Sequence, residues 1–310
     1  MREIHRVAVI GGGVIGKSWA SLCLARGLQV VVVDPRKSVE NDLSVYIERA
    51  WPLLQALDLV VDGASKAPEF STEISSLVGI DFVAECGPER IEFKHDIVEQ
   101  LEAVIEDDVM ISSSTSSLKP SDIQRNARVP SRLFVGHPMN PPHTVPMVEL
   151  VAGEKTDPAV MSQAEDFYRE RLDRVTIRVQ KEVVGHLANR LTSALYREAV
   201  NIVAEGIGRV EDVDKAIAYG PGMRWALMGP HLTYHMGGGD GGYRNYLDHF
   251  GPTQEARWRE LGTPAITESL KSILVSQLDE ELSQQDTENL AGRRDEALVE
   301  LLHLKKRYGF

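Results

Sequence analysis

The sequence predicts an α/β protein in which a doubly wound sheet covered by helices is followed by an all-α C-terminal domain. Three observations support this fold class. Short β-branched runs alternate with helical stretches up to about residue 180, which predicts a parallel sheet wrapped by helices. A glycine-rich turn directly follows the first of these runs, and after Gly185 apolar residues recur only at helical spacing.

The expected strands are the β-branched runs at 7–10, 30–33, 80–84, 110–111, 133–135 and 175–179. We therefore assign residues 1–184 to a nucleotide-binding domain and residues 185–310 to a helical domain. In the helical domain we expect core packing from an apolar stripe made of Leu187, Leu191, Ala194, Leu195, Ile202, Val203, Val213, Ala216 and Ile217.

Composition narrows the partners of this 310-residue chain. Its net charge of −12 repels polyanions, so we expect neither a nucleic-acid nor a membrane partner. The two cysteines, Cys23 and Cys86, lie among apolar neighbours and form no disulfide framework, which indicates free thiols and a cytoplasmic location. We expect no metal site, because the pair His231 and His235 has no carboxylate or cysteine at a useful offset.

A dinucleotide-binding motif opens the chain. In VAVIGGGVIGKSWA, Gly11 permits a tight turn, Gly13 lets a pyrophosphate approach the backbone, and Gly16 allows close helix packing. Asp34 ends the next β-branched run, 18 residues past Gly16, where it would accept hydrogen bonds from the adenosine ribose. The motif predicts a Rossmann-type domain whose cofactor-binding residues are Gly11, Gly13, Val14, Ile15, Gly16 and Asp34.

The acidic residue also bears on the choice of cofactor. Asp34 would repel a 2′-phosphate, which favours NAD over NADP. Arg36 and Lys37 leave tolerance of NADP open, because a nearby cation can accommodate the extra phosphate.

A histidine and a carboxylate flank the proline-rich stretch VGHPMNPPHTVPMVEL. His137 closes a predicted strand, so it should lie at the carboxyl edge of the sheet, where such sheets bind ligands. Glu149 follows 12 residues later, and the two side chains would meet if the segment between them returns. A carboxylate on one ring nitrogen would orient His137 as a general base. The alternative is a structural histidine that is hydrogen-bonded to a neighbour.

Several stretches together resemble the 3-hydroxyacyl-CoA dehydrogenase superfamily, in matching order along nearly the whole chain. They are VAVIGGGVIGKSWA, AECGPERIEFK, SSSTSSL, GHPMNPP, VPMVELV and GHLANRL. The SSSTS form and YGPGMRWALMGPHLTYHMGGGDGG are similar to L-carnitine 3-dehydrogenases and to L-gulonate 3-dehydrogenase, the lambda-crystallin type. The resemblance implies NAD-dependent oxidation of an L-3-hydroxy acid, and a homodimer built through the helical domain.

The same resemblance implies roles for individual residues. His137 becomes the general base and Glu149 its orienting carboxylate. Ser116 and Asn189 match polar residues that hold the substrate oxygen, and Ser116 also counts among the cofactor-binding positions. Further cofactor-site positions implied by the motifs are Glu89, Lys94 and Asn140. Each has a structural alternative: a loop or helix cap for Ser116, a helix bridge for Asn189, and a solvated pair for Glu89 with Lys94.

The sequence restricts the identity of the substrate less than it restricts the fold and the cofactor. Departures from the acyl-CoA type, such as GPGMRWALMGP, favour a small free acid over a CoA thioester. Aromatic residues crowd the segment from Trp225 to Trp258, and aromatic faces hold a quaternary ammonium well, so a carnitine-like substrate is expected. L-gulonate, another short 3-hydroxy acid, an acyl-CoA, and a non-catalytic NAD-binding role stay as alternatives. Candidate substrate residues are Arg224, Trp225, Tyr234 and Tyr243, with Lys94 as a second candidate for the carboxylate.

Overall fold

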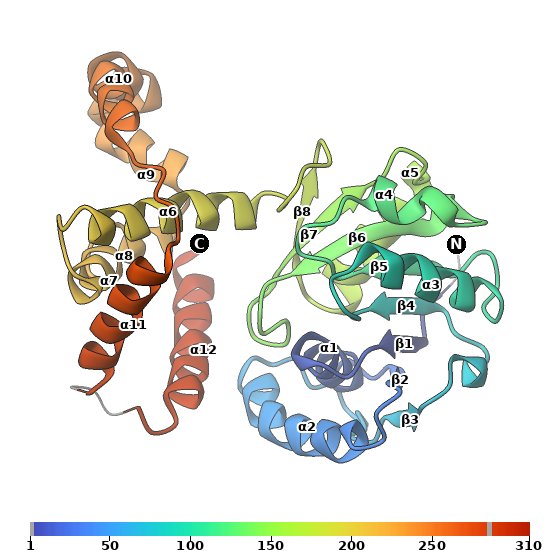
Figure 1. The fold of residues 1–310 in the computed structure, drawn as a ribbon. Coiled ribbons are helices and arrows are strands. Elements are labelled where there is room, and N and C mark those ends of the chain that lie inside the picture. Colours follow the sequence, from blue (N-terminus) through green and yellow to red (C-terminus); the bar gives the residue numbers. More distant parts are fainter. Residues whose placement is uncertain (1–2, 284–286) are drawn as a thin grey trace. The chain divides into compact units, whose positions relative to one another are not determined.

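The computed structural model describes residues 3–283 and 287–310 (Figure 1). The chain divides into two compact units, Met1–Arg190 with Asp295–Val299, and Leu191–Arg294 with Glu300–Phe310. The boundary that the sequence places at residue 184 stays a prediction.

The first unit contains an eight-stranded sheet in the order β3-β2-β1-β4-β5-β6-β7-β8. Neighbouring strands are parallel except for β6 and β7, which pair antiparallel. The strands are β1 (Arg6–Ile10), β2 (Gln29–Val33), β3 (Glu69–Ser71), β4 (Phe82–Glu85), β5 (Met110–Ser113), β6 (Leu133–Pro138), β7 (Met147–Ala152) and β8 (Val175–Val179).

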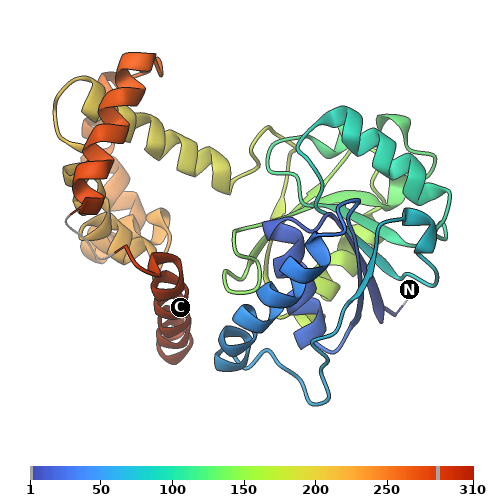
Figure 2. The ribbon, with the colours of Figure 1, turned by 60° about the horizontal axis from the view of Figure 1, so that its bottom comes forward.

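Helices cover both faces of this sheet (Figures 1 and 2). One face packs against α1 (Val14–Ala25), α2 (Val39–Ala56) and α5 (Pro158–Asp166). The other face packs against α3 (Ile91–Glu102) and α4 (Pro120–Ile123). Because both faces are covered, successive side chains of a central strand are apolar on both sides, which is why the strands read as unbroken β-branched runs.

The sequence pattern located six of the eight strands. It missed β3, whose residues EFS carry little apolar character, as suits a short strand at the sheet edge. It also treated the apolar run of β7 only as a returning segment. The prediction of a parallel sheet is wrong at one pairing: β6 and β7 are antiparallel, because the chain reverses direction between them, and the sheet is mixed.

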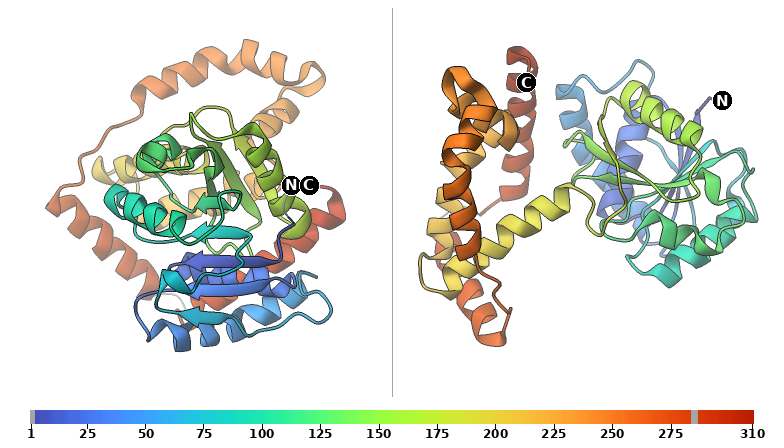
Figure 3. Two further views of the ribbon diagram at one scale, coloured as in Figure 1. Left: turned by 90° about the vertical axis from the view of Figure 1, so that its right-hand side faces the viewer. Right: turned by 90° about the horizontal axis from the view of Figure 1, so that it is seen from above.

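The second unit is helical, and its course can be followed from yellow to red in Figure 3. Its helices are α6 (Ala188–Ala204), α7 (Val210–Ala218), α8 (Pro221–Trp225), α9 (Pro230–Gly237), α10 (Gly242–Glu260), α11 (Glu268–Ser283) and α12 (Leu290–Tyr308), of which α6 and α12 contribute residues to both units. In the part of the chain that the structure describes, none of the helices has the length and apolar character needed to cross a bilayer.

The apolar stripe predicted as core is only partly buried. Val203 is buried, but Leu187, Leu191 and Leu195 are 42, 67 and 40% exposed. The core prediction is wrong for these three leucines and for Ala194 and Ala216, which are also exposed. Helical spacing identifies an apolar face, but it does not show whether the same chain covers that face.

Candidate active site

His137 and Glu149 lie directly opposite each other on the antiparallel strands β6 and β7. The His137 Nδ1 and Glu149 Oε2 atoms are 2.7 Å apart, and the two residues are 5 and 0% exposed. A carboxylate only accepts hydrogen bonds, so the assigned tautomer has the proton on Nδ1 and leaves Nε2 as a proton acceptor. The pair is therefore arranged as a buried, oriented base.

The second carboxylate oxygen of Glu149 is also held. Its Oε1 accepts hydrogen bonds from the backbone N–H groups of Leu187 and Ala188, at 2.8 and 2.9 Å. Burial acts to raise the pKa of Glu149, but the hydrogen bonds from His137 and from these amides outweigh it and lower the pKa. Glu149 is thus a carboxylate with all its partners fixed, ionised at neutral pH.

A serine-rich loop follows β5 and is organised by one carboxylate. Glu89 Oε1 accepts hydrogen bonds from Thr115 Oγ1 at 2.6 Å, Ser116 N at 3.0 Å and Ser117 N at 2.9 Å. The hydroxyls of Ser116 and Ser117 donate to the same oxygen at 3.3 and 2.9 Å. Burial raises the pKa of Glu89, while the bonds from Thr115 and Ser117 lower it further than burial raises it.

The start of α6 joins this loop to the histidine pair. His186 Nε2 contacts the Thr115 carbonyl oxygen at 3.2 Å, and Asn189 Nδ2 donates to the Ser116 carbonyl oxygen at 3.1 Å. The ring centroids of His186 and His137 are 5.3 Å apart. The four residues predicted as catalytic are therefore linked through one network of hydrogen bonds in the first unit.

The segment between β6 and β7 is pinned at its middle. His143 N donates to Ser18 Oγ at 2.9 Å, and the same hydroxyl lies 2.8 Å from His143 Nδ1. Burial lowers the pKa of His143 to about 4, so this ring is neutral at physiological pH. Arg174 Nη1 donates to the Pro142 carbonyl oxygen at 3.0 Å. Asn140, predicted to support the site, lies exposed in this segment.

The glycine-rich turn has the backbone geometry that the motif predicts. Gly11 has φ +98°, which favours glycine. A Cβ on Gly16 would lie 1.8 Å from the Gly11 carbonyl oxygen, whereas a Cβ on Gly13 would meet open space. The helix α1 begins at Val14, so the unpaired N–H groups of its first turn, including those of Val14 and Ile15, follow directly. These residues fit the pyrophosphate of a dinucleotide, which the fold accommodates at a helix N-terminus.

Asp34 lies immediately after β2 and next to this turn. Its Oδ2 accepts a hydrogen bond from Gly12 N at 2.9 Å, and the residue is 3% exposed. The carboxylate also forms an ion pair with the Arg36 guanidinium, whose Nη2 atom donates to Oδ2 at 2.9 Å. The adenosine end of a bound dinucleotide would therefore meet an acidic side chain fixed by backbone and partly neutralised by an arginine.

Lys94 is buried and paired inside the first unit. Its Nζ donates to Glu85 Oε1 at 2.8 Å and to the Gly87 carbonyl oxygen at 3.1 Å, and the side chain is 1% exposed. The ammonium is engaged inside the first unit, so it is neither a solvated partner of Glu89 nor open to a substrate carboxylate. An unpaired buried lysine is costly, and Glu85 compensates its charge.

The predicted aromatic residues stack on one another. The rings of Tyr234 and Tyr246 are 4.5 Å apart at 12°, and those of Tyr243 and Tyr246 are 6.3 Å apart at 9°. Parallel rings cover one another's faces, so these tyrosines form a ladder between α9 and α10 rather than the box of faces that surrounds a cation. Arg224 and Trp225 belong to another helix, α8.

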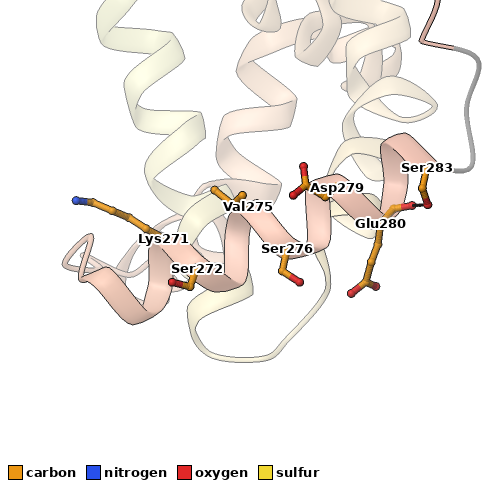
Figure 4. Close-up of a pocket in the computed structure, with 7 residues that line it drawn as sticks. All are labelled: Lys271, Ser272, Val275, Ser276, Asp279, Glu280 and Ser283. Carbon is orange, nitrogen blue, oxygen red and sulfur yellow. Dashed lines mark hydrogen bonds between the residues drawn. The ribbon is translucent and has the colours of Figure 1, made fainter.

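A surface hollow of about 720 Å³ lies along α11 (Figure 4). Seven residues of this one helix line it: Lys271, Ser272, Val275, Ser276, Asp279, Glu280 and Ser283. The hollow carries no histidine, and neither the His137–Glu149 pair nor the glycine-rich turn lines it, so it is not a candidate for the chemistry.

Sequence reasoning missed two parts of the site. His186 is fully buried with φ +48°, and its Nδ1 atom has no hydrogen-bond partner among the described residues. Thr115, also buried, supplies both a hydroxyl to Glu89 and a carbonyl to His186. His186 could have been noticed from its position in GHLANRL, just before a helix. The first N–H groups of a helix have no partner within the helix and need acceptors from elsewhere in the protein.

Comparison with known proteins agrees with this geometry. Residues 6–183 match the model of the 3-hydroxyacyl-CoA dehydrogenase NAD binding domain, and residues 185–266 match that of the 3-hydroxyacyl-CoA dehydrogenase C-terminal domain. The chain is 41% identical over 309 residues to an L-carnitine dehydrogenase of Streptomyces coelicolor, covering 99% of this chain and 96% of that protein. It is 40% identical over 298 residues to an L-carnitine dehydrogenase of Nocardiopsis dassonvillei, covering 96 and 90%.

The solved structures give the same result. The crystal structure of 5-formyl-3-hydroxy-2-methylpyridine 4-carboxylic acid 5-dehydrogenase, an NAD+ dependent dismutase, superposes with a TM-score of 0.84 at 26% identity, covering 98% of this chain and 99% of that one. The paired imidazole and carboxylate thus lie in a chain whose whole length matches dehydrogenases. The chain belongs to the 3-hydroxyacyl-CoA dehydrogenase family and is an NAD-dependent dehydrogenase.

Proposed function

We propose that this chain oxidises the 3-hydroxyl group of L-carnitine, or of a closely similar small L-3-hydroxy acid, to the 3-keto acid with NAD. The observation that carries the proposal is the buried His137–Glu149 pair, with 2.7 Å between Nδ1 and Oε2. The choice of L-carnitine rests on full-length relatives near 40% identity whose names carry that substrate.

His137 and Glu149 divide the proton chemistry. Bound NAD would supply the hydride acceptor beside the reacting carbon. Neutral His137 takes the hydroxyl proton on Nε2, and ionised Glu149 stabilises the resulting imidazolium through Nδ1. In the reverse direction the imidazolium returns the proton to the carbonyl oxygen.

Ser116 and Asn189 hold the substrate oxygen in this proposal. Ser116 Oγ donates to Glu89 in the structure. Because the substrate hydroxyl gives its single proton to His137, Ser116 would turn its own O–H from Glu89 to donate to the substrate oxygen. A terminal amide has two N–H groups, so Asn189 can give one to the Ser116 carbonyl and the other to the oxygen as its charge develops.

The test is NADH formation with a panel of acids. L-carnitine, L-gulonate, short L-3-hydroxy acids and a 3-hydroxyacyl-CoA are compared at equal concentration, with the His137→Ala variant as the matched blank. The proposal expects turnover of L-carnitine that falls by at least about 10²-fold in the variant, while NADH binding persists. Turnover of L-gulonate or of the thioester alone would move the substrate assignment to that class. No turnover of any acid would favour a non-catalytic NAD-binding role.

We also propose a homodimer through the helical domain. It is supported by large apolar side chains that are exposed in the second unit, among them Leu191, Tyr196, Trp258, Ile273 and Val275. Light scattering at low micromolar concentration tests the mass, and replacing Leu191 and Leu195 with Glu should release monomers.

The two free thiols, the buried Cys23 and the half-buried Cys86, support a reducing compartment such as the cytoplasm. Location of a tagged full-length chain in cell fractions tests that assignment.

A further inference from the structure

The carboxylate of Asp34 already holds four hydrogen bonds. Oδ1 accepts from Arg36 N at 3.0 Å and from Arg36 Nε at 3.0 Å. Oδ2 accepts from Gly12 N at 2.9 Å and from Arg36 Nη2 at 2.9 Å. A carboxylate offers about four lone-pair positions, so Asp34 has no acceptor left for another donor.

A ribose diol needs acceptors on this same carboxylate, and the four bonds are not equally easy to break. Those from Gly12 N and Arg36 N come from the backbone of the glycine turn and of the bend after β2. The other two come from a side chain that is 66% exposed, against 4% for its partner. The guanidinium is therefore the group that must leave when the ribose binds.

The position of the guanidinium has a second effect, on charge. The Asp34 carboxylate is ionised at neutral pH, because its hydrogen bonds hold its pKa below the ordinary value despite burial. Alone it would repel a phosphate on the ribose 2′ oxygen. Arg36 neutralises that charge and brings donors in a planar fork, which matches phosphate oxygens.

We propose that Arg36 is a specificity residue for the cofactor: it covers the ribose-binding carboxylate of Asp34 in the free protein and, when displaced, supplies the cation that lets the site accept NADP as well as NAD. This inference concerns the adenosine end of the cofactor and is independent of the substrate proposed above.

Two opposite effects follow from removing this side chain. In Arg36→Ala the carboxylate loses a competitor, so NADH should bind as tightly as before or a few-fold more tightly. The 2′-phosphate loses its partner and meets an uncompensated carboxylate, so NADPH should bind at least about tenfold more weakly. A merely structural arginine would change both affinities alike.

The experiment is a fluorescence titration of the full-length protein with NADH and with NADPH. The matched control is Lys37→Ala. It removes the neighbouring cation, whereas the side-chain bonds to Asp34 come from Arg36. The ratio of the NADH and NADPH affinities in this variant should stay within about twofold of the wild-type ratio. We expect wild type to bind both cofactors, and only Arg36→Ala to lose NADPH selectively.

Two outcomes would overturn the proposal. One is a wild-type protein that binds no NADPH at millimolar concentration, and the other is an Arg36→Ala variant with equal changes for both cofactors. A salt series on wild type provides a check without any variant, since NADPH affinity should fall more steeply with ionic strength than NADH affinity. These readouts are binding constants, so inactivity towards L-carnitine would leave them unaffected.

Discussion

Replacing Glu149 with glutamine changes one atom and tests the proposed base. The structure fixes how the new amide lies, because the N–H groups of Leu187 and Ala188 need an acceptor at the Oε1 position. The glutamine oxygen must stay there, so its NH₂ group takes the place of Oε2 and faces His137 Nδ1 at 2.7 Å. That NH₂ group can only donate, so Nδ1 must become the acceptor.

The proton of the ring then moves to Nε2, and His137 can no longer take a proton from the substrate. A positioned base is worth about 10² to 10⁴ in rate, and a wrong tautomer in a comparable triad costs about 10⁴. We expect kcat of Glu149→Gln to fall by at least about 10², with little change in NADH affinity, because the cofactor motif lies elsewhere.

The assay is steady-state NADH formation with the best acid of the panel, together with NADH titration. Glu154→Gln is the matched control, since this carboxylate follows β7 and is exposed. A Glu149→Gln enzyme that keeps kcat within about threefold of wild type would refute the tautomer argument. Equal losses in kcat and in NADH binding would instead identify Glu149 as structural.

Other predictions concern stability and reactivity. Lys94→Met leaves Glu85 charged and buried, so the free energy of unfolding in denaturant should fall by about 3 to 5 kcal/mol; a loss below 1 kcal/mol would contradict the buried pair. The pKa of Glu149 is lowered on folding, so its contribution to stability is present above about pH 4.3 and is lost as pH falls through the folded-state pKa. The unfolding temperature of wild type should therefore fall more between pH 7 and pH 3 than that of Glu149→Gln. Equal falls in unfolding temperature for the two proteins would argue against this contribution of Glu149. Burial raises the pKa of the Cys86 thiol to about 12, so alkylation of the native protein at pH 8 should be far slower than after unfolding.

The N-terminal part of the fold could be predicted because its signals are local. A β-branched run, a glycine turn, a helix and Asp34 follow one another within a short stretch, and each constrains the next. The direction of β7 could not be predicted, because nothing in its residues indicates whether the strand runs parallel or antiparallel to its neighbour. The meeting of His137 with Glu149 could be proposed from the sequence, but the pairing that produces it is a tertiary property.

Other features depend on burial, which spacing does not report. Lys94 lies in a helix with charged neighbours, and only the approach of Glu85 from β4 makes it an internal cation. Leu191 and Leu195 follow the same helical period as buried residues, yet their side chains are exposed. Tyr234 and Tyr243 were predicted to offer their faces to a cation, and they stack with Tyr246 because α9 and α10 pack side by side.

The antiparallel pairing of β6 with β7 sets what changes of length the site tolerates. His137 and Glu149 are cross-strand partners, so a change of length between them leaves them opposed only where it falls in exposed residues outside the two strands, such as Asn140. Displacing one strand past the other by a single position would instead send the carboxylate to the opposite side of the sheet, away from the imidazole. Natural insertions and deletions in this family should therefore avoid both strands, and also the buried middle of the segment, where His143 is bonded to Ser18.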